Sequence, residues 1–305
     1  MSTSKESIYI LNTGSPEAEH RRLNTQHFVF TDIMRGELLP AHIQVPLLSS
    51  PSASPPKILE IATGSAIWLL EMSKLLPADA ELVGVDLDTS KFPPAESLPG
   101  NISLRTHNMH EPFPDELRGR FDVVNVRLII FALKEGLGVK LAQNLLTLLK
   151  PGGYLVWTET GPLLTSVEPP SINWYQFQDI NYRFAKKVGR DLNLPLAMRH
   201  YLSLAGFTEC DDRAYPGNSQ LFNPDNGPHW LERTNALFRS FIAQTLRGIV
   251  SLGGVQDGGI SMSTDAEAED LIRRCDAELA DDTHKIHYLL IRAWGRKPGA
   301  EGHTS

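Results

Sequence analysis

The spacing of apolar residues changes along the chain, and the first spacing predicts a helical arm. From residue 15 onward, apolar side chains recur every three or four positions, as on one face of a helix. The positions on this face are Leu23, His27, Phe30 and Met34. Ser15 suits the N-cap and Pro16 the first helical position, and two glutamates follow in the first turn. We therefore expect an N-terminal helical arm within residues 1–50.

A second spacing begins at residue 57, where short apolar runs alternate with helical periods. The runs that read as strands are 58–62, 81–86, 101–106, 121–126 and 154–159. Short apolar strands separated by helices predict a mostly parallel sheet with helices on both faces. Such a sheet binds ligands beyond the carboxyl ends of its strands. We expect residues 51–305 to form this α/β unit.

The alternation stops after Pro162, and the next part of the chain is rich in aromatic residues. Residues from about 162 to 285 predict a helical insert, interrupted by a glycine-rich loop at 251–262. The apolar run 285–294 predicts a last strand. An aromatic helical insert beside an α/β sheet is suited to forming a lid over a substrate pocket.

Candidate ligand-binding residues follow the first three predicted strands. Glu60 lies at the end of the first strand and is followed by small residues at Ala62, Gly64 and Ala66. Small residues let the backbone approach a ligand, although such turns also occur for packing alone. Asp86 ends the second strand, where a carboxylate can accept both hydroxyls of a ribose. Together with Asn108 after the third strand, these positions favour a nucleoside site.

Five segments together resemble the class I S-adenosylmethionine-dependent methyltransferases, and in particular those of fungal secondary metabolism. The segments are "EHRRLNTQH", "ILEIATGSAIW", "VGVDLD", "LPGNISLRTHNMHEPFPDELRGRFDVVNVRLI" and "LLKPGGYLVWTE". The resemblance implies a Rossmann-like fold, with a central, mostly parallel seven-stranded sheet and helices on both faces. It also implies S-adenosyl-L-methionine as cofactor and S-adenosyl-L-homocysteine as product, with no metal.

The resemblance assigns cofactor-binding roles by matching position. Glu60 would contact the methionine amino group, Asp86 the ribose hydroxyls and Leu87 one adenine face. The remaining positions implied for the cofactor are Ala62 and Gly64 beside the methionine and ribose, Asn108 and Met109 at the adenine edge, Asn125 and Arg127 beside the sulfonium, and Tyr9 as a cover. Ala66 replaces a glycine of the family, and its methyl group is expected to crowd the cofactor.

Catalytic and substrate-binding candidates are less strongly indicated, because core packing explains most of them equally well. His27, on the apolar face of the arm, is the first candidate for a general base. Glu159 and Arg127 are the other catalytic candidates, since both follow central strands. The substrate-binding candidates are Arg22, Gln26, Trp174, Tyr175, His229 and Trp230.

The composition of the chain argues against several kinds of binding partner. A net charge of −7 argues against a nucleic-acid surface, and no apolar run approaches the about 20 residues of a membrane span. Two cysteines cannot form a disulfide framework, which favours a cytoplasmic protein. No metal-ligand spacing is present in the sequence. A small-molecule substrate is expected, and a homodimer stays an open alternative.

The leading hypothesis is methyl transfer to an oxygen or nitrogen of a secondary metabolite. Two alternatives keep the fold without this reaction. One is a methyltransferase-like protein recruited as a pericyclase or cyclase, and the other is a non-methylating regulator. Ala66 and Asn108 depart from the family pattern, where glycine and aspartate are more usual, and these departures keep both alternatives open.

Overall fold

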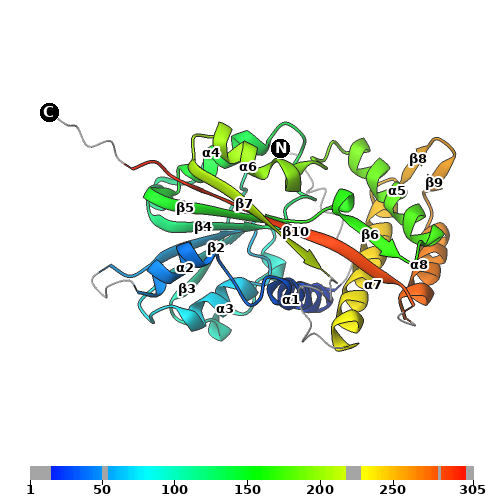
Figure 1. Ribbon diagram of the computed structural model, residues 1–305, viewed down its shortest axis with the longest axis horizontal. Helices are drawn as coiled ribbons and strands as arrows, with labels where there is room; N and C mark the ends of the chain where they lie inside the picture. The colour runs from blue at the N-terminus through cyan, green and yellow to red at the C-terminus, as the bar shows by residue number, and fades with distance from the viewer. Residues whose placement is uncertain (1–14, 50–53, 218–227, 281–282, 300–305) are drawn as a thin grey trace, which may run out of the picture.

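A single large sheet forms the centre of the molecule (Figure 1). The computed structural model describes residues 15–49, 54–217, 228–280 and 283–299, with backbone only at 228–231. Within these ranges the sheet has eight strands in the order β3-β2-β1-β4-β5-β10-β6, with β7 paired to β10. Its strands are β1 Lys57–Ile61, β2 Glu81–Asp86, β3 Ile102–Thr106, β4 Phe121–Arg127, β5 Leu149–Glu159, β6 Thr165–Glu168, β7 Thr208–Gly217 and β10 Lys285–Arg296.

The first five strands run parallel, as the alternating pattern predicts. Strand β1 lies between β2 and β4, with Glu60 level with Gly84 on one side and with Asn125 on the other. Sequence order therefore reverses between β1 and β4. In an open α/β sheet, this reversal is where the loops at the carboxyl ends of the strands separate and leave room for a ligand. The prediction of a mostly parallel sheet is confirmed.

The antiparallel end of the sheet holds one strand more than the seven expected. Strand β10 pairs with β5 along its second half, where Ile291 is level with Glu159. Its first half pairs with β6, where Tyr288 is level with Thr165. Because β10 is 12 residues long, it extends beyond the end of β5. The chain after β5 then supplies hydrogen bonds to the backbone groups of β10 that β5 does not reach.

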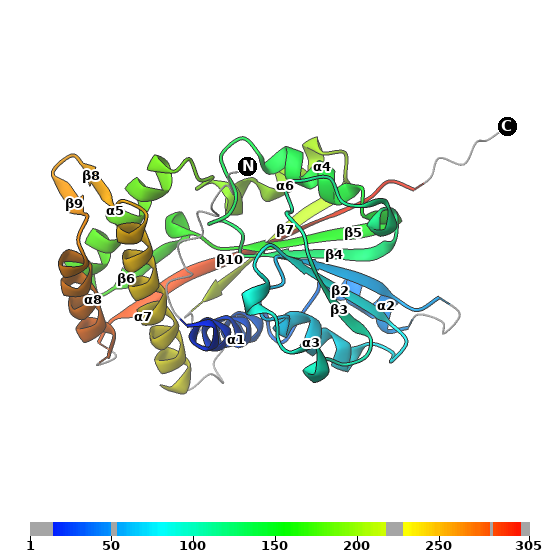
Figure 2. The ribbon, with the colours of Figure 1, turned by 180° about the vertical axis from the view of Figure 1, so that it is seen from behind.

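The helices form two layers on the sheet and a separate group at its end (Figure 2). Helices α4 and α6 cover one face, whereas α2 and α3 cover the other, and α5, α7 and α8 gather beyond the antiparallel end. The helices are α1 Pro16–Ile33, α2 Ala41–Leu48, α3 Ile67–Leu75, α4 Gly138–Leu146, α5 Ile172–Lys187, α6 Leu194–Leu204, α7 Pro228–Ser251 and α8 Asp265–Ala280. Each group packs around its own buried apolar cluster.

The predicted arm helix is confirmed. The Ser15 hydroxyl caps α1 by accepting a hydrogen bond from the Ala18 amide at 3.3 Å. His27, Phe30 and Met34 are all buried on its inner face. Helix α1 contacts α3 on one side and α7 on the other, so it joins the sheet domain to the helical group. This position brings its inner face to the carboxyl ends of the central strands.

The glycine-rich segment expected as a loop at 251–262 is different in the structure. It forms a two-stranded hairpin, β8 Val255–Asp257 and β9 Ile260–Met262. Gly258 and Gly259 both have positive φ and make the turn between the strands. Glycine adopts this conformation readily, so the same residues that signalled a loop allow a tight hairpin.

No helix among the described residues is long and apolar enough to span a lipid bilayer.

Candidate functional site

A cavity of about 740 Å³ lies at the carboxyl ends of β1, β2 and β4. We call it the main cavity. Its wall is formed by the loop after β1, the ends of β2 and β3, the segment after β4 and the inner face of α1. The wall residues are Leu23, Gln26, His27, Ile61–Ser65, Ile67, Val85–Asp88, Lys91, His107–His110, Arg127–Ile129, Phe131–Lys134, Val188 and Arg190. Ligand cavities occur preferentially at this position in α/β sheets.

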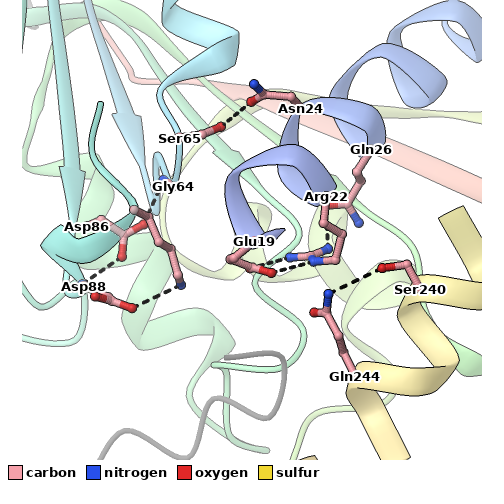
Figure 3. Close-up of polar contacts among 11 residues, drawn as sticks. Glu19, Arg22, Asn24, Gln26, Gly64, Ser65, Asp86, Asp88, Ser240 and Gln244 are labelled. Atoms are coloured by element: carbon pink, nitrogen blue, oxygen red, sulfur yellow. Dashed lines mark hydrogen bonds and ion pairs between the residues drawn. The ribbon is translucent and has the colours of Figure 1, made fainter. Parts of the chain in front are cut away.

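The loop after β1 bends sharply so that its backbone faces the second strand. Ala62, Gly64 and Ala66 all have positive φ, between 54° and 58°. The Gly64 amide donates a hydrogen bond to Asp86 Oδ2 at 2.8 Å, and Asp86 Oδ1 accepts one from the Asp88 amide at 3.0 Å (Figure 3). These bonds hold the Asp86 carboxylate at the cavity wall, where it is half-buried.

Ala66 differs from expectation. It is fully buried in the apolar cluster beneath α3 and does not contribute to the wall of the main cavity. At φ 58° it serves as the N-cap residue of α3, with its side chain turned towards the core. The prediction that its methyl group crowds a cofactor is therefore wrong, because Ala66 packs in the core and does not line the main cavity.

The positions predicted for the adenosine part of a cofactor all lie on the wall. Leu87 is 52% exposed and follows Asp86 directly. Met109 lies on the same wall and packs against the core below. The Asn108 side-chain oxygen accepts from the His110 amide at 3.1 Å, and its amide group donates to Glu111 Oε1 at 3.3 Å. These bonds fix the orientation of the Asn108 side chain at the edge of the cavity.

Four polar side chains form a connected network at the wall of the main cavity. Arg127 donates from Nε and Nη2 to a single oxygen of Glu60, at 3.2 and 2.9 Å. Its Nη1 lies 3.2 Å from His27 Nδ1. The second Glu60 oxygen accepts from the Thr63 hydroxyl at 2.7 Å. Arg127 and His27 contribute to the wall, whereas Glu60 lies beneath them and is 1% exposed.

The same network determines the protonation of its members. Burial, together with the charge of Arg127, lowers the pKa of His27 to about 3. The imidazole is therefore neutral, and because Nδ1 accepts from Arg127, the proton is on Nε2. Nε2 is buried and has no hydrogen-bond partner among the described residues. Burial raises the pKa of Glu60, while Arg127 and Thr63 act in the opposite direction.

Asn125 and Glu159 occupy positions that differ from those expected. Asn125 is 1% exposed and level with Glu60 inside the sheet, and it does not reach the main cavity. Glu159 is fully buried and also outside the wall. Its Oε1 accepts from the Ile129 amide at 2.7 Å and from Trp157 Nε1 at 3.0 Å, and burial raises its pKa to about 8. Glu159 thus holds the segment after β4 in place rather than facing the crevice.

A second, smaller space of about 70 Å³ lies between α1, α5 and α7. We call it the side chamber. Its wall residues are Arg22, Gln26, Phe30, Leu128, Ile130, Phe131, Thr160–Pro162, Thr165, Trp174, Gln178, Asn181, Leu237, Phe238 and Phe241. Gln26, Leu128 and Phe131 belong to both walls, so the two spaces are neighbours.

The substrate-binding candidates divide between this chamber and other places. Arg22, Gln26 and Trp174 line the side chamber. Figure 3 shows Arg22 on α1 facing Glu19, to which it donates at 2.7 and 2.8 Å. Tyr175 is 48% exposed on the outer side of α5 and contributes to neither space, so its expected place in a pocket is wrong. Tyr9 and the side chains of His229 and Trp230 lie outside the described residues.

Several residues that line or support the site were not identified from the sequence. Phe131 follows β4 in a run that reads only as apolar, and Arg190 comes from a distant loop. Thr63 supports Glu60 from within the predicted loop. Asn24 on α1 accepts from the Ser65 hydroxyl at 2.8 Å and thereby docks the arm on that loop (Figure 3). Of these, only Thr63 and Asn24 lay in segments already marked as functional.

Among the residues that the structure describes, His, Cys, Asp and Glu side chains form no group of three or more that could hold a metal ion. The network around Arg127 contains one carboxylate and one neutral imidazole, and the guanidinium occupies the space between them.

Comparisons with known proteins relate this site to a family. A family model described as "Methyltransferase domain" matches residues 34–208. Methyltransferase grgD of a Penicillium species is 29% identical over 77% of this chain and 79% of its own length. N-methyltransferase tcpN of Claviceps purpurea is 33% identical, over 54% of this chain and 57% of its own. The secondary metabolism regulator LAE1 of Gibberella fujikuroi is 25% identical, over 88% of this chain and 84% of its own.

Proposed function

The chain belongs to the methyltransferase domain family, and on that premise we propose that it is an S-adenosyl-L-methionine-dependent methyltransferase. Its acceptor is an oxygen or nitrogen of a small secondary metabolite. The observation that carries this proposal is the main cavity, which lies where the strand order reverses and has the half-buried Asp86 carboxylate on its wall. Relatives that are named methyltransferases and N-methyltransferases support the reaction class.

The residues of the main cavity fit this cofactor. Its volume of about 740 Å³ falls within the roughly 300–1,000 Å³ of ordinary ligand pockets. Asp86 would accept hydrogen bonds from the ribose hydroxyls, and Leu87 would cover one adenine face. Asn108 and Met109 would meet the adenine edge, and the bent loop at Ala62 and Gly64 would approach the cofactor with its backbone.

Arg127 is the residue that we place at the amino-acid end of the cofactor. Its guanidinium contributes to the wall, whereas Glu60 lies behind it. A guanidinium pairs well with a carboxylate, so Arg127 would bind the methionine carboxylate. Glu60 then acts through Arg127 as a positioning residue, which replaces the direct contact with the amino group implied by the family resemblance.

The chemistry requires little acid–base work from the protein. When bound, the cofactor would supply an electrophilic methyl group on a cationic sulfur: the acceptor would bond to the methyl carbon while the carbon–sulfur bond breaks and the neutral thioether leaves. The protein must align the acceptor and exclude water, and these two effects can provide much of the acceleration. Helix α1 contributes Leu23, Gln26 and His27 to the wall of the cavity. We infer that this arm is the principal barrier to water.

His27 is better suited to orienting a ligand than to removing a proton. With a pKa of about 3, its imidazole is a weak base, and its Nδ1 is already engaged by Arg127. Its Nε2–H is buried, contributes to no described hydrogen bond, and belongs to a residue of the cavity wall. We propose that Nε2–H donates to an oxygen or nitrogen acceptor of the substrate or cofactor.

A fold that binds the cofactor without transferring its methyl group is the second candidate. The observations that favour it are that His27 is a weak base whose Nδ1 is engaged by Arg127, and that Glu159 lies outside the cavity wall, so both are unsuited to removing a proton from an acceptor. The similarity to the regulator LAE1 points in the same direction. The cytoplasmic location, the homodimer and the absence of nucleic-acid or membrane partners stay predictions.

Calorimetry followed by a transfer assay distinguishes these candidates. We expect S-adenosyl-L-homocysteine to bind the wild-type protein and to bind Asp86→Ala at least 10-fold more weakly, because charge-assisted hydrogen bonds contribute about 1.5–3 kcal/mol. Asp115→Asn, at a carboxylate that is 94% exposed, is the matched control. Transfer of a tritiated methyl group to a panel of phenols, carboxylic acids and secondary amides then separates the first candidate from the second. Absence of cofactor binding contradicts the proposal.

A further inference from the structure

The side chamber has the features of a built binding site. Five aromatic side chains contribute to its wall: Phe30, Phe131, Trp174, Phe238 and Phe241. Their rings also contact one another, with centroids 5.8 Å apart for Phe131 and Phe241 and 5.9 Å apart for Trp174 and Phe238. Such contacts favour defined orientations of the rings. An aromatic wall favours a flat ligand.

Three residues of this wall carry a buried polar atom without a hydrogen-bond partner among the described residues, namely Trp174, Asn181 and Thr160, and the first two are the most deeply buried. Trp174 is 3% exposed and its Nε1 has no hydrogen-bond partner among the described residues. Asn181 is 1% exposed and its Oδ1 is likewise without a described partner. Leaving such a buried group unpaired costs about 1–3 kcal/mol. Because Trp174 and Asn181 both line the chamber, a ligand that offers one acceptor and one donor would satisfy the two groups.

The charge of the chamber is compensated. Arg22 is the single charged residue among the described residues of its wall. The two Arg22–Glu19 hydrogen bonds, at 2.7 and 2.8 Å, form a buried ion pair in which both side chains are at most 5% exposed. A ligand with a net charge would meet no free opposite charge here and would lose its hydration. The chamber therefore favours a neutral ligand.

The size of the chamber limits how much of the ligand it can hold. Its volume of about 70 Å³ is roughly half that of an engineered 150 Å³ cavity that binds benzene. The chamber thus takes one edge of a ring, and the rest of the molecule must lie in the neighbouring main cavity. Phe131, Leu128 and Gln26 stand between the two spaces. An acceptor held in this way reaches from the chamber towards the cofactor.

We propose that the side chamber binds the acceptor substrate, and that this acceptor is a neutral, planar aromatic or heteroaromatic molecule with a hydrogen-bond acceptor and a donor on one edge. Trp174 Nε1–H donates to the ligand, and Asn181 Oδ1 accepts from it. This inference rests on the proposed function for the identity of the bound molecule as a methyl acceptor. The recognition of a neutral ring edge depends only on the side chamber itself.

Benzamide is the probe, because it combines an aromatic ring with a carbonyl acceptor and an amide donor. Benzoate has the same shape but carries a charge, and it serves as the ligand control. The protein is labelled with 5-fluorotryptophan, and the resonance that disappears in Trp174→Phe is assigned to Trp174. We expect benzamide to shift this fluorine resonance and benzoate to leave it unchanged. The same titrations are repeated with S-adenosyl-L-homocysteine present.

The affinity of benzamide is then measured by ligand-observed NMR for three variants with native circular dichroism. Trp174→Phe and Asn181→Leu should each weaken binding about 3- to 10-fold, the value of one hydrogen bond. Tyr182→Phe changes a partly exposed residue of the same helix that lines neither space, and it should bind as the wild type does. The fluorine shift provides a test on the wild-type protein that does not depend on how well the variants fold.

The outcomes separate this inference from the proposed function. The inference is overturned if the Trp174 resonance does not respond, if benzoate binds as tightly as benzamide, or if both variants keep the wild-type affinity. When S-adenosyl-L-homocysteine binds and benzamide does not, only the side-chamber inference fails. When benzamide binds as expected and the cofactor product does not, the proposed methyltransferase function fails and the side chamber remains a site for a neutral ring.

Discussion

Arg127 and Glu60 form an ion pair in which the guanidinium donates from Nε and Nη2 to one buried carboxylate oxygen. The Arg127 side chain is 13% exposed and contributes to the cavity wall, whereas Glu60 is 1% exposed behind it. The pair therefore connects the interior of the sheet to the ligand space. Since Arg127 also reaches His27 on α1, it joins the arm to the first and fourth strands.

Arg127→Met should destabilise the protein by about 3–5 kcal/mol, because it leaves a buried carboxylate without its cation. The double variant Glu60→Gln/Arg127→Met should recover a large part of this loss, since it removes both charges. Urea unfolding of the two single variants and the double variant gives the interaction free energy. If the double variant loses as much unfolding free energy as Glu60→Gln and Arg127→Met lose in sum, the two side chains do not stabilise each other.

The stability of the protein should fall with rising pH because of Glu159. Burial raises the pKa of this carboxyl from 4.5 to about 8, so the folded state binds more protons than the unfolded state between these values. The contribution of the Glu159 carboxyl to the free energy of unfolding is thus fully present below pH 4.5 and is lost as the pH rises through 8. The slope is about 1.4 kcal/mol per pH unit at most.

Glu159→Gln isolates this contribution, because an amide keeps the shape and the acceptor for the Ile129 amide but cannot ionise. The difference in unfolding free energy between wild type and variant should move in favour of the variant from pH 5 to pH 8. Urea denaturation at four pH values measures it. A constant difference over this range would mean that Glu159 is ionised in the folded protein at neutral pH.

His27 should stay neutral over the whole physiological range. Its pKa falls from 6.5 to about 3 through burial and the neighbouring Arg127. We expect ¹⁵N NMR to show the proton on Nε2 and no titration between pH 5 and pH 8. The unfolded state takes up a proton that the folded state excludes, so the stability due to His27 is present above pH 6.5 and is lost as pH falls towards 3.

His27→Gln removes the loss of stability that His27 causes as the pH falls below 6.5. It is the variant to compare with Glu159→Gln. Between pH 4.5 and 6.5 the effects of His27 and Glu159 have opposite signs and largely cancel in the wild type. The two variants should therefore show opposite pH slopes relative to the wild type in this window. Slopes of the same sign would contradict the assigned protonation of at least one residue.

Gly84→Ala should destabilise the protein by about 1–3 kcal/mol through overpacking. A Cβ at this position of β2 would lie 2.6 Å from Leu104 Cδ2 and 2.9 Å from both Leu69 Cδ1 and Thr63 Cγ2. Thr63 holds the Glu60 carboxylate, so the affinity for S-adenosyl-L-homocysteine should fall as well. Gly100→Ala, where a Cβ meets nothing within 4 Å, is the control for urea unfolding and calorimetry.

The periodic parts of the structure could be predicted from the sequence. The cap at Ser15 and the inward face of α1 depend on residues within one helix, and the parallel strands depend on short apolar runs. Ala62, Gly64, Asp86 and Asn108 could be assigned to the ligand space because each lies at the end of a strand or within three residues after it. Parallel strands end on the same side of a sheet, so this placement follows from local sequence alone.

Tertiary structure decided which of these groups face the ligand and which are covered. Glu60, Asn125 and Glu159 all belong to central strands, yet packing from other elements buries each of them. Arg127 pairs with Glu60 from 67 positions away and with His27 from 100 positions away. The side chamber likewise combines residues of α1, α5 and α7 that share no sequence pattern. Local sequence determines the period and the ends of each element, whereas burial and charge pairing depend on neighbours that only the folded chain brings together.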